Sequence, residues 1–394
     1  MKKILTIISE YNPFHLGHEY HLNESIKQIN PDYKVAIISG NFVQRGEPSI
    51  INKWEKAKVA ITAGFDLIIE LPCIYSISSA ENFANGAIKI ANEIGTTHLS
   101  FGSEDGKVEN LNKLSQLISE NENTYIKKIK EKIALGNSYP KSQELVINEM
   151  FSNEFENICS PNNILGLEYL KSIKKLNSTI KAITIKRNFD FNSSSNIRSI
   201  LRNSQNLSIK ILPKYSLNAI NENINSGSLV YSLKNFEKEI LFTLRKMTIE
   251  DLKNIPDLPE NLLNKFKKAS NSCNSLEELI SILKNKSITQ ARIQRILLYI
   301  LLSITKKDME ISKSTTPYLR ILATNQKGKE LLSDISKKTP NVITSVKQFE
   351  EKCQNQSLLK LLEIDKLATN IYTLAYTQNS KSNLDYTTKI IERN

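Results

Sequence analysis

Near its N-terminus the chain reads Glu10-Tyr11-Asn12-Pro13-Phe14-His15-Leu16-Gly17-His18, between an apolar run at Ile4–Ile8 and a segment with helical spacing of apolar residues at His18–Ile29. Three of the four histidines of the chain, His15, His18 and His21, lie in or beside this string. A glycine lets a ligand approach the backbone closely, and the start of a helix offers unpaired N–H groups with partial positive charge. Two imidazoles where a strand gives way to a helix therefore predict a site for the phosphates of a nucleotide.

A strand followed by His-x-Gly-His at the start of a helix is the signature of the nucleotidylyltransferase superfamily. The longer string Glu-Tyr-Asn-Pro-Phe-His-x-Gly-His resembles one branch of it, the tRNA(Met) cytidine acetate ligases. The resemblance implies that His15 and His18 are catalytic: they hydrogen-bond the phosphates of ATP and stabilise charge at the α-phosphorus and on the departing pyrophosphate. The residues that the resemblance places against ATP are Ile7, Ile8, Ser9, Glu10, Tyr11, Asn12, Pro13, Phe14, His15, Leu16, Gly17, His18, Glu19 and Tyr20.

Two other interpretations of these histidines stay open. They are surface residues of a loop, or His15, His18 and His21 form a metal site. A metal site is disfavoured because this His-x-x-His segment lacks a matched carboxylate ligand and a glutamate base. We expect His21, one helical turn further on, to be a solvated or packing residue.

A second string, Ser193-Ser194-Ser195-Asn196-Ile197-Arg198, follows the last apolar run of the first half, Ile180–Lys186. It resembles the Ser-Ser-Thr/Ser-x-Ile-Arg string of the superfamily. Ser194 or Ser195 would cap a helix here. The resemblance implies that the N–H groups of that helix and Arg198 hold the β- and γ-phosphates of ATP. The alternative is a serine-capped helix with an exposed arginine.

Three later segments, at predicted strand ends or helix starts, also resemble the family. The resemblance places Gly102 close to adenosine, has the amide of Asn162 contact the nucleotide, and puts Arg187 and Asn188 beside it. A turn glycine, a helix N-cap and a strand end are the alternatives for these positions.

A polar turn at Ser39–Pro48 follows the second apolar run and also resembles the family. Its Arg45, and Lys53 at the next helix start, are candidates for binding the carboxylate of acetate or the tRNA. The alternative is an exposed loop charge and an ordinary helix-start lysine.

Residues 1–105 alternate apolar runs with amphipathic segments, which predicts right-handed βαβ units and a parallel sheet covered on both faces. The runs expected as strands are Ile4–Ile8, Val35–Ile38, Asp66–Leu71, Thr97–Phe101 and, after a helical insertion at 108–176, Ile180–Lys186. Ligands bind at the carboxyl ends of such strands, where the unusual residues lie. The predicted class is α/β: a Rossmann-like, doubly wound parallel sheet of the nucleotidylyltransferase type with a helical insertion, plus a mostly α-helical, basic C-terminal domain.

We expect two domains, a nucleotidylyltransferase-like, ATP-binding catalytic domain at residues 1–205 and a helical, basic, tRNA-binding domain at residues 206–394. Residues 1–200 hold 23 Lys and Arg against 22 Asp and Glu, whereas residues 201–394 hold 30 against 19, so the excess positive charge lies in the second half. A cationic half fits a polyanion such as RNA. The alternative is a Lys-, Asn- and Ile-rich composition produced by AT-rich coding.

One segment of the second half, Thr289–Thr305, is predicted to form a helix with an apolar side. Its Arg292 and Arg295 are three residues apart and share a face. They are candidates for contacts to tRNA phosphates. A solvated helix face is the alternative.

No apolar run approaches the ~18 residues that a membrane span needs. The run at Ile4–Ile8 is short, and no small-residue cleavage site of a secretory signal follows it. The four cysteines are far apart and include no Cys-x-x-Cys pair, which argues against a disulfide framework or a zinc knuckle and suits a reducing compartment. We therefore expect a cytoplasmic protein with no membrane partner.

The resemblance implies an ATP-dependent ligase. It would form N4-acetylcytidine at the wobble position (C34) of elongator tRNA(Met) from acetate and ATP through an acetyl-adenylate, with Mg²⁺ accompanying ATP. Three alternatives stay open: a small-molecule adenylyltransferase of coenzyme biosynthesis, a class I aminoacyl-tRNA synthetase, and a non-catalytic RNA-binding protein with a nucleotidyltransferase fold. The synthetase is disfavoured because the string Lys-Met-Ser-Lys-Ser is absent.

Overall fold

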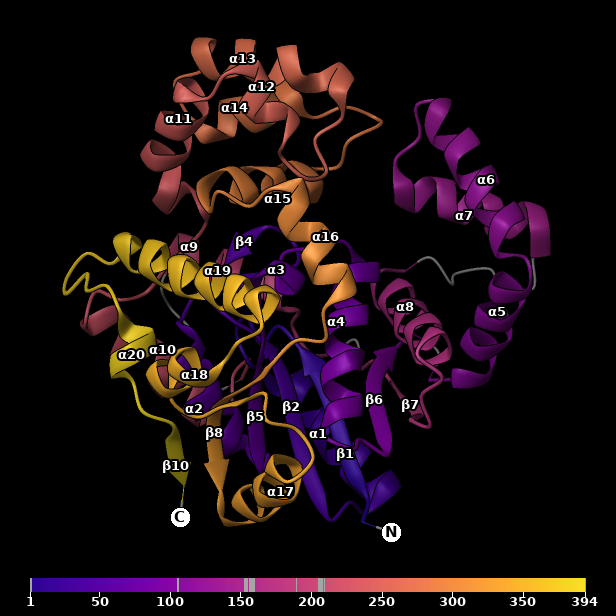
Figure 1. The fold of residues 1–394 in the computed structure, drawn as a ribbon, viewed down its shortest axis with the longest axis vertical. Helices are drawn as coiled ribbons and strands as arrows, with labels where there is room; N and C mark the ends of the chain where they lie inside the picture. The colour runs from indigo at the N-terminus through magenta and orange to yellow at the C-terminus, as the bar shows by residue number, and fades with distance from the viewer. Residues whose placement is uncertain are drawn as a thin grey trace.

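The computed structural model describes residues 2–104, 106–151, 155, 160–188, 190–204, 208 and 210–393. A central sheet has the strand order β10-β8-β5-β2-β1-β6-β7, with β9 paired to β8 (Figure 1). Neighbouring strands are parallel except β5 and β8, which are antiparallel. The strands of this sheet are β1 (Ile4–Ser9), β2 (Tyr33–Ser39), β5 (Leu67–Leu71), β6 (His98–Ser103), β7 (Lys181–Lys186), β8 (Leu319–Asn325), β9 (Val342–Ile343) and β10 (Ile391–Arg393).

The sheet is covered on both faces, as the strand and helix alternation predicts. Ile4 and Ile8 of β1 enter one apolar core, while Ile7, which points the other way, enters a second. Helices α4 (Ala80–Glu93) and α8 (Pro161–Lys175) supply residues to the first core. Helices α1 (Leu16–Ile29), α2 (Lys53–Ala63) and α9 (Ser194–Ser204) supply residues to the second. The predicted doubly wound, parallel sheet is confirmed, except that β8 runs antiparallel to β5.

The predicted helical insertion lies between β6 and β7. It consists of α5 (Val108–Glu120), α6 (Glu122–Ala134), α7 (Tyr139–Phe151) and α8. In Figure 1, α6 and α7 project upward from the body of the molecule beside the sheet. Helix α8 instead packs against α4 and β6, so that the end of the insertion returns the chain to the sheet for β7.

The second half of the chain is mostly helical, as predicted, but it does not stand apart from the sheet. Strand β8 pairs with β5 of the first half, and β9 and β10 pair with β8. A domain boundary at residue 205, as expected, would therefore cut through the sheet, because strands of both halves form it. Residues 205–207 and 209 are outside the described part of the chain. Sequence periodicity missed β8 because six of its seven residues are buried, which removes the alternation expected of a strand with one solvated face.

The helices of this half form an upper lobe and a second group placed around the sheet (Figure 1). The upper helices are α11 (Glu237–Lys246), α12 (Ile249–Lys253), α13 (Leu263–Ser272), α14 (Leu276–Leu283) and α15 (Gln290–Leu301). The remaining helices are α10 (Lys214–Asn225), α16 (Lys306–Ser314), α17 (Gln326–Ser336), α18 (Val346–Lys352), α19 (Gln356–Tyr372) and α20 (Leu384–Thr387). Within the described ranges, no helix is both long and apolar enough to cross a membrane.

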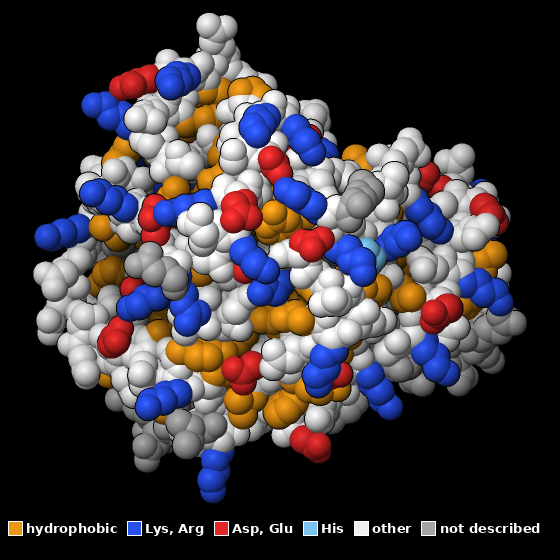
Figure 2. All heavy atoms as spheres, turned by 90° about the horizontal axis from the view of Figure 1, so that it is seen from below, with side chains coloured by type: hydrophobic (Ala, Val, Ile, Leu, Met, Phe, Trp, Pro, Cys, Tyr) orange, Lys and Arg blue, Asp and Glu red, His pale blue; other side chains and the backbone are white. Residues whose placement is uncertain are grey.

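Figure 2 shows the face seen from below in Figure 1, where the N-terminus lies and β1 begins. Lys and Arg side chains are spread across this face, with acidic and apolar side chains between them. The positive charge of the chain is therefore not gathered into a single patch here. The carboxyl ends of the parallel strands, where the unusual loops lie, are at the opposite end of the sheet.

Candidate active site

The two histidines of the N-terminal string lie at the start of α1. His15 is the N-cap, and its Nδ1 accepts a hydrogen bond from the backbone N–H of Gly17 at 3.0 Å. The Nδ1 of His18 accepts from the backbone N–H of His15 at 3.2 Å. Because both Nδ1 atoms are acceptors, each neutral ring carries its proton on Nε2. The pair therefore presents two Nε2–H donors.

The two rings are stacked, with centroids 3.8 Å apart. Burial, with a smaller effect of Arg187, lowers the pKa of His15 to about 4. Burial and the neighbouring His15 and His21 lower the pKa of His18 well below its ordinary value. Both imidazoles are therefore neutral at pH 7 and donate hydrogen bonds without carrying a charge. Gly17 permits this arrangement, because a Cβ on it would lie 2.9 Å from Cε1 of His15.

His21 belongs to the packing beneath α1. Its Nε2 is 2.9 Å from Oγ of Ser100 on β6, and Oγ of Ser25 is 2.7 Å from the same Oγ. Across the described part of the chain, no three His, Cys, Asp or Glu side chains are arranged to hold a metal ion. Of the two roles expected for His21, the structure fits the packing residue.

The start of α9 meets the loop that precedes α1, so the two predicted phosphate strings lie together. Arg198 Nη1 donates to the backbone carbonyl of Asn12 at 2.8 Å. Oγ of Ser195 accepts from Arg198 Nη2 at 3.4 Å and from Arg45 Nη1 at 3.5 Å. Ser194 is the first residue of α9. The prediction that these strings converge is in agreement with this geometry.

Arg198 is not the exposed arginine of the alternative interpretation. It is buried, and Nη2 lies 3.2 Å from Oε2 of Glu47, which also pairs with Arg202. Its guanidinium therefore ties α9 to the loop at Asn12 and to β4 (Glu47–Pro48) of the short hairpin with β3 (Phe42–Val43). Sequence reasoning did not single out Glu47, although it lies in the polar turn that was noted.

The four residues expected near adenosine lie at the ends of β6 and β7 and the start of α8. Nδ2 of Asn162 donates to Oε1 of Glu104 at 3.1 Å, and Nη1 of Arg187 lies 3.8 Å from the same oxygen. A Cβ added to Gly102 would find no protein atom within 4 Å, so the space above this glycine is open to a ligand. The Oδ1 of Asn188 accepts a hydrogen bond from the backbone N–H of Asp190.

Glu104 joins Asn162 to Arg187, and sequence reasoning missed this role. The signal was present, because Glu104 directly follows β6 in a segment that resembles the family. A hollow of about 400 Å³ lies nearby between α1 and β7. Its lining residues are Tyr20, Glu24, Lys27, Gln28, Thr184, Ile185 and Lys186.

Lys56, one turn into α2, contacts the loops after two strands. The sequence did not indicate this role. Its Nζ donates to the backbone carbonyls of Glu10, Ser39 and Gly40 at 3.1, 2.6 and 2.7 Å. These carbonyls follow or end β1 and β2, so the lysine fixes the loops that carry the site. Burial lowers the pKa of Lys56 to about 7. A lysine inside a helix gives no sequence signal of this kind.

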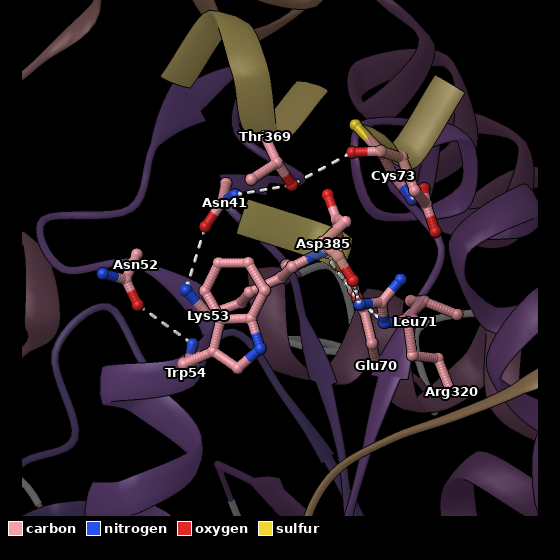
Figure 3. A network of polar contacts seen from close by, with 12 residues as sticks. Asn41, Asn52, Lys53, Trp54, Glu70, Leu71, Cys73, Arg320, Thr369 and Asp385 are labelled. Atoms are coloured by element: carbon pink, nitrogen blue, oxygen red, sulfur yellow. Dashed lines mark hydrogen bonds and ion pairs between the residues drawn. The ribbon is translucent and has the colours of Figure 1, made fainter. Parts of the chain in front are cut away.

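The two candidates for acetate or tRNA in the first half have different surroundings. Arg45 is exposed beside the start of α9. Lys53 is fully buried: its Nζ lies 3.0 Å from Glu70 and 2.7 Å from Asp385 (Figure 3). Arg320 of β8 pairs with the same two carboxylates. The expectation that Lys53 binds a substrate is therefore wrong, because its charge is used inside the protein.

The two arginines expected to contact tRNA phosphates are held by a loop of the upper lobe. Nε and Nη2 of Arg292 donate to the backbone carbonyl of Asp257 at 3.1 and 2.8 Å. Nε of Arg295 lies 3.7 Å from the carboxylate of Asp257, and its side chain is 13% exposed. They do share a face of α15, as predicted, but that face packs against the protein. The use of both guanidinium groups on Asp257 argues against the expected contacts to tRNA phosphates, which remain a prediction.

Comparison with known proteins agrees with this geometry. The family model described as HIGH Nucleotidyl Transferase matches residues 1–387. The tRNA(Met) cytidine acetate ligases of Thermoanaerobacter sp. (strain X514) and Acetivibrio thermocellus are 40% and 38% identical to the chain, with 99% of each sequence covered. The crystal structure of Thermotoga maritima TmcAL bound with alpha-thio ATP superposes with a TM-score of 0.93 at 30% identity, covering 99% of both chains. The chain belongs to the HIGH nucleotidyl transferases and, among them, to the tRNA(Met) cytidine acetate ligase family.

Proposed function

We propose that the protein is an ATP-dependent ligase that acetylates N4 of the wobble cytidine (C34) of elongator tRNA(Met). The observation that carries the proposal is the pair of neutral, stacked imidazoles at the start of α1, beside the serine-led start of α9. The relatives that cover nearly all of the chain are named tRNA(Met) cytidine acetate ligases, which supports the proposal. The triphosphate of ATP is the substrate group that these donors suit.

In the first step a carboxylate oxygen of acetate attacks the α-phosphorus of ATP. An O–P bond forms to give acetyl-adenylate, and the bond to the bridging oxygen breaks, so that pyrophosphate leaves with the electron pair. The Nε2–H groups of His15 and His18 and the N–H groups at the start of α1 donate to the phosphate oxygens, where negative charge is placed. The site holds the reactants in line, and no side-chain nucleophile is needed.

Arg45 is the candidate for holding acetate. Its guanidinium is exposed at the mouth of the site and lies 3.5 Å from Oγ of Ser195. A guanidinium binds a carboxylate through two parallel hydrogen bonds, which would orient one oxygen toward the phosphorus. The positive charge of Arg45 would also offset the repulsion between acetate and the phosphates.

In the second step N4 of the cytidine attacks the carbonyl carbon of acetyl-adenylate. A C–N bond forms, the C–O bond to phosphate breaks, and AMP leaves. The tRNA would be held by the second half of the chain, where 30 Lys and Arg face 19 Asp and Glu. Mg²⁺ would accompany ATP through the phosphate oxygens, since the described side chains form no cluster able to hold a metal ion. We place the enzyme in the cytoplasm, where its tRNA substrate is found.

Two measurements test this function. Acetate should support the exchange of labelled pyrophosphate into ATP, and mass spectrometry should find N4-acetylcytidine in tRNA(Met) after incubation with ATP and acetate. Exchange with other acids but not with acetate would favour a small-molecule adenylyltransferase. Binding of tRNA with neither exchange nor AMP formation would favour a non-catalytic RNA-binding protein.

A further inference from the structure

Glu10 directly follows β1 and places a carboxylate among the cationic groups of the site. Its Oε1 accepts a hydrogen bond from the backbone N–H of Gln44 at 2.9 Å. The charges of Arg45, Arg198 and Lys56 all act on it. The side chain is half-buried, not sealed in the core. Its surroundings are therefore those of the site, because Arg45 and Arg198 both donate to Ser195 at the start of α9.

The triphosphate does not explain this carboxylate, since a negative group repels phosphate oxygens. The hydrogen bond from Gln44 does not explain it either, because a neutral amide oxygen would accept that bond equally well. The proposed reaction does contain a step that needs a base. The N4 amine must lose a proton when it becomes an amide, and the amine of cytosine is a weak nucleophile until that proton is removed.

The other groups at this edge of the sheet are already engaged. The Nδ1 atoms of His15 and His18 accept backbone N–H groups, which leaves these rings as donors. Glu47 pairs with Arg198 and Arg202, and Glu104 with Asn162 and Arg187. Burial raises the pKa of Glu10, so it holds a proton more strongly than an exposed glutamate does.

We propose that Glu10 is the general base of the acetyl-transfer step, a role that rests on the proposed function. As N4 bonds to the carbonyl carbon, one of its protons moves to the carboxylate of Glu10. The C–O bond to AMP breaks, and AMP leaves with the electron pair. Glu10 then returns the proton to solvent. The first step, in which acetate attacks ATP, transfers no proton and does not need this group.

The test separates the two steps in the full-length chain. Glu10→Gln removes the basic group and keeps an oxygen for the N–H of Gln44. At saturating ATP and acetate, the rate of pyrophosphate exchange should stay close to that of the wild type, because this step needs no base even though the resemblance places Glu10 beside ATP. Transfer from synthetic acetyl-adenylate to tRNA(Met) should fall by about 100- to 10,000-fold, the usual effect of losing a general base. Glu10→Asp, which keeps a carboxylate, should recover part of the transfer rate.

Glu144→Gln is the matched control, because Glu144 lies on α7 of the insertion and pairs with Lys141 of the same helix. It should leave both rates unchanged. The wild-type transfer rate should also fall at acid pH as Glu10 takes up a proton, and this fall should be missing in Glu10→Gln. The pH at which the rate falls is set by the groups that face Glu10, which are Arg45, Arg198, Lys56 and Tyr169.

Two results would overturn the assignment. Equal loss of exchange and transfer in Glu10→Gln would place the residue in ATP or acetate binding. Normal transfer in Glu10→Gln would remove it from the chemistry. If the wild-type chain neither exchanges pyrophosphate with acetate nor uses acetyl-adenylate, the proposed function itself fails and the role of Glu10 fails with it.

Discussion

Two polar clusters in this protein differ in what their side chains have left to offer. In the cluster around Lys53, each cation lies against two carboxylates, and the four side chains are at most 5% exposed. In the cluster at the start of α1, the imidazoles are neutral and only one nitrogen of each is used by the backbone contacts described. In the first cluster, the charges pair with one another and stabilise the fold. The second keeps donors for a ligand.

This difference explains why one sequence-based expectation failed and another agreed with the geometry. Lys53 and His15 both lie at the start of a helix that follows a loop at the carboxyl end of the sheet. The two residues differ in their partners, because a distant segment of the chain supplies a carboxylate to Lys53. Asp385 of the second half pairs with Lys53, and Arg320, also of the second half, pairs with the same carboxylate (Figure 3). What distinguishes a ligand-binding side chain from a structural one here is whether its polar atoms remain available to a ligand, not its residue type or its position.

The largest expected effect comes from breaking the buried cluster. Lys53→Met should lower the free energy of unfolding by about 3–5 kcal/mol, because it leaves Glu70 and Asp385 with a single cation between them. Urea denaturation at pH 7 measures this change. Lys58→Met on the same helix is the control, since Lys58 is 53% exposed and its removal should matter little. If Lys53→Met unfolded at the same urea concentration as the wild type but lost acetate-dependent activity, Lys53 would be a substrate-binding residue after all.

Removing a donor from the second cluster should affect the reaction more than the fold. His18→Ala and His15→Ala should each lower acetate-dependent pyrophosphate exchange by about 100- to 1,000-fold, as expected when one donor to developing charge is lost. His98→Ala is the control, because His98 begins β6 at the other end of the sheet. Exchange at the wild-type rate in either variant would mean that the imidazoles do not act on the phosphates.

A smaller, pH-dependent effect should come from His21. Burial lowers its pKa to about 4, against 6.5 in the unfolded chain. Between these values the unfolded chain binds more protons, so His21 makes the folded state less stable as the pH falls from about 7 to about 4. The stability advantage of wild type over His21→Gln should therefore shrink across this range in urea denaturation. Buried carboxylates with raised pKa values, such as Asp365, have the opposite effect, but they are common to both proteins.

The smallest effect is expected at the arginines of α15. Arg292→Gln should leave the affinity for tRNA(Met) nearly unchanged, because its guanidinium is used on the carbonyl of Asp257. Filter binding across a range of salt concentrations measures this. A fall in affinity together with a salt slope reduced by about 1 would show that Arg292 reaches a phosphate after all.

The sequence predicted the first half of the fold well because its signals are local. Apolar runs such as Ile4–Ile8 and amphipathic segments such as Lys53–Ala63 mark β1 and α2 directly. Strand β8 was missed because it is buried on both faces and joins the sheet through β5, more than 240 residues earlier in the chain. No periodicity within a segment records such a pairing.

The candidate site also has residues that the sequence revealed and residues that only the structure reveals. The strings containing His15 and Ser195 could be found from the residues and from resemblance, and the structure brings them together. The contributions of Glu47 and Lys56 could not be read from the sequence, because each depends on carbonyls or arginines supplied by other elements. Glu104 lies in a segment that resembles the family, but its pairing with Arg187 at the end of β7 is seen only in the structure. Arg198 was found, but its burial against Asn12 was not.

The most direct test concerns the protons on the two stacked imidazoles. The chain has four histidines, so a two-bond ¹⁵N–¹H correlation spectrum contains few ring signals, which single substitutions can assign. His15 and His18 should be neutral at pH 7 with the proton on Nε2, and an ATP analogue should shift the Nε2 signals of both rings. Imidazolium rings at pH 7, protons on Nδ1, or signals that do not respond to the nucleotide would contradict the account.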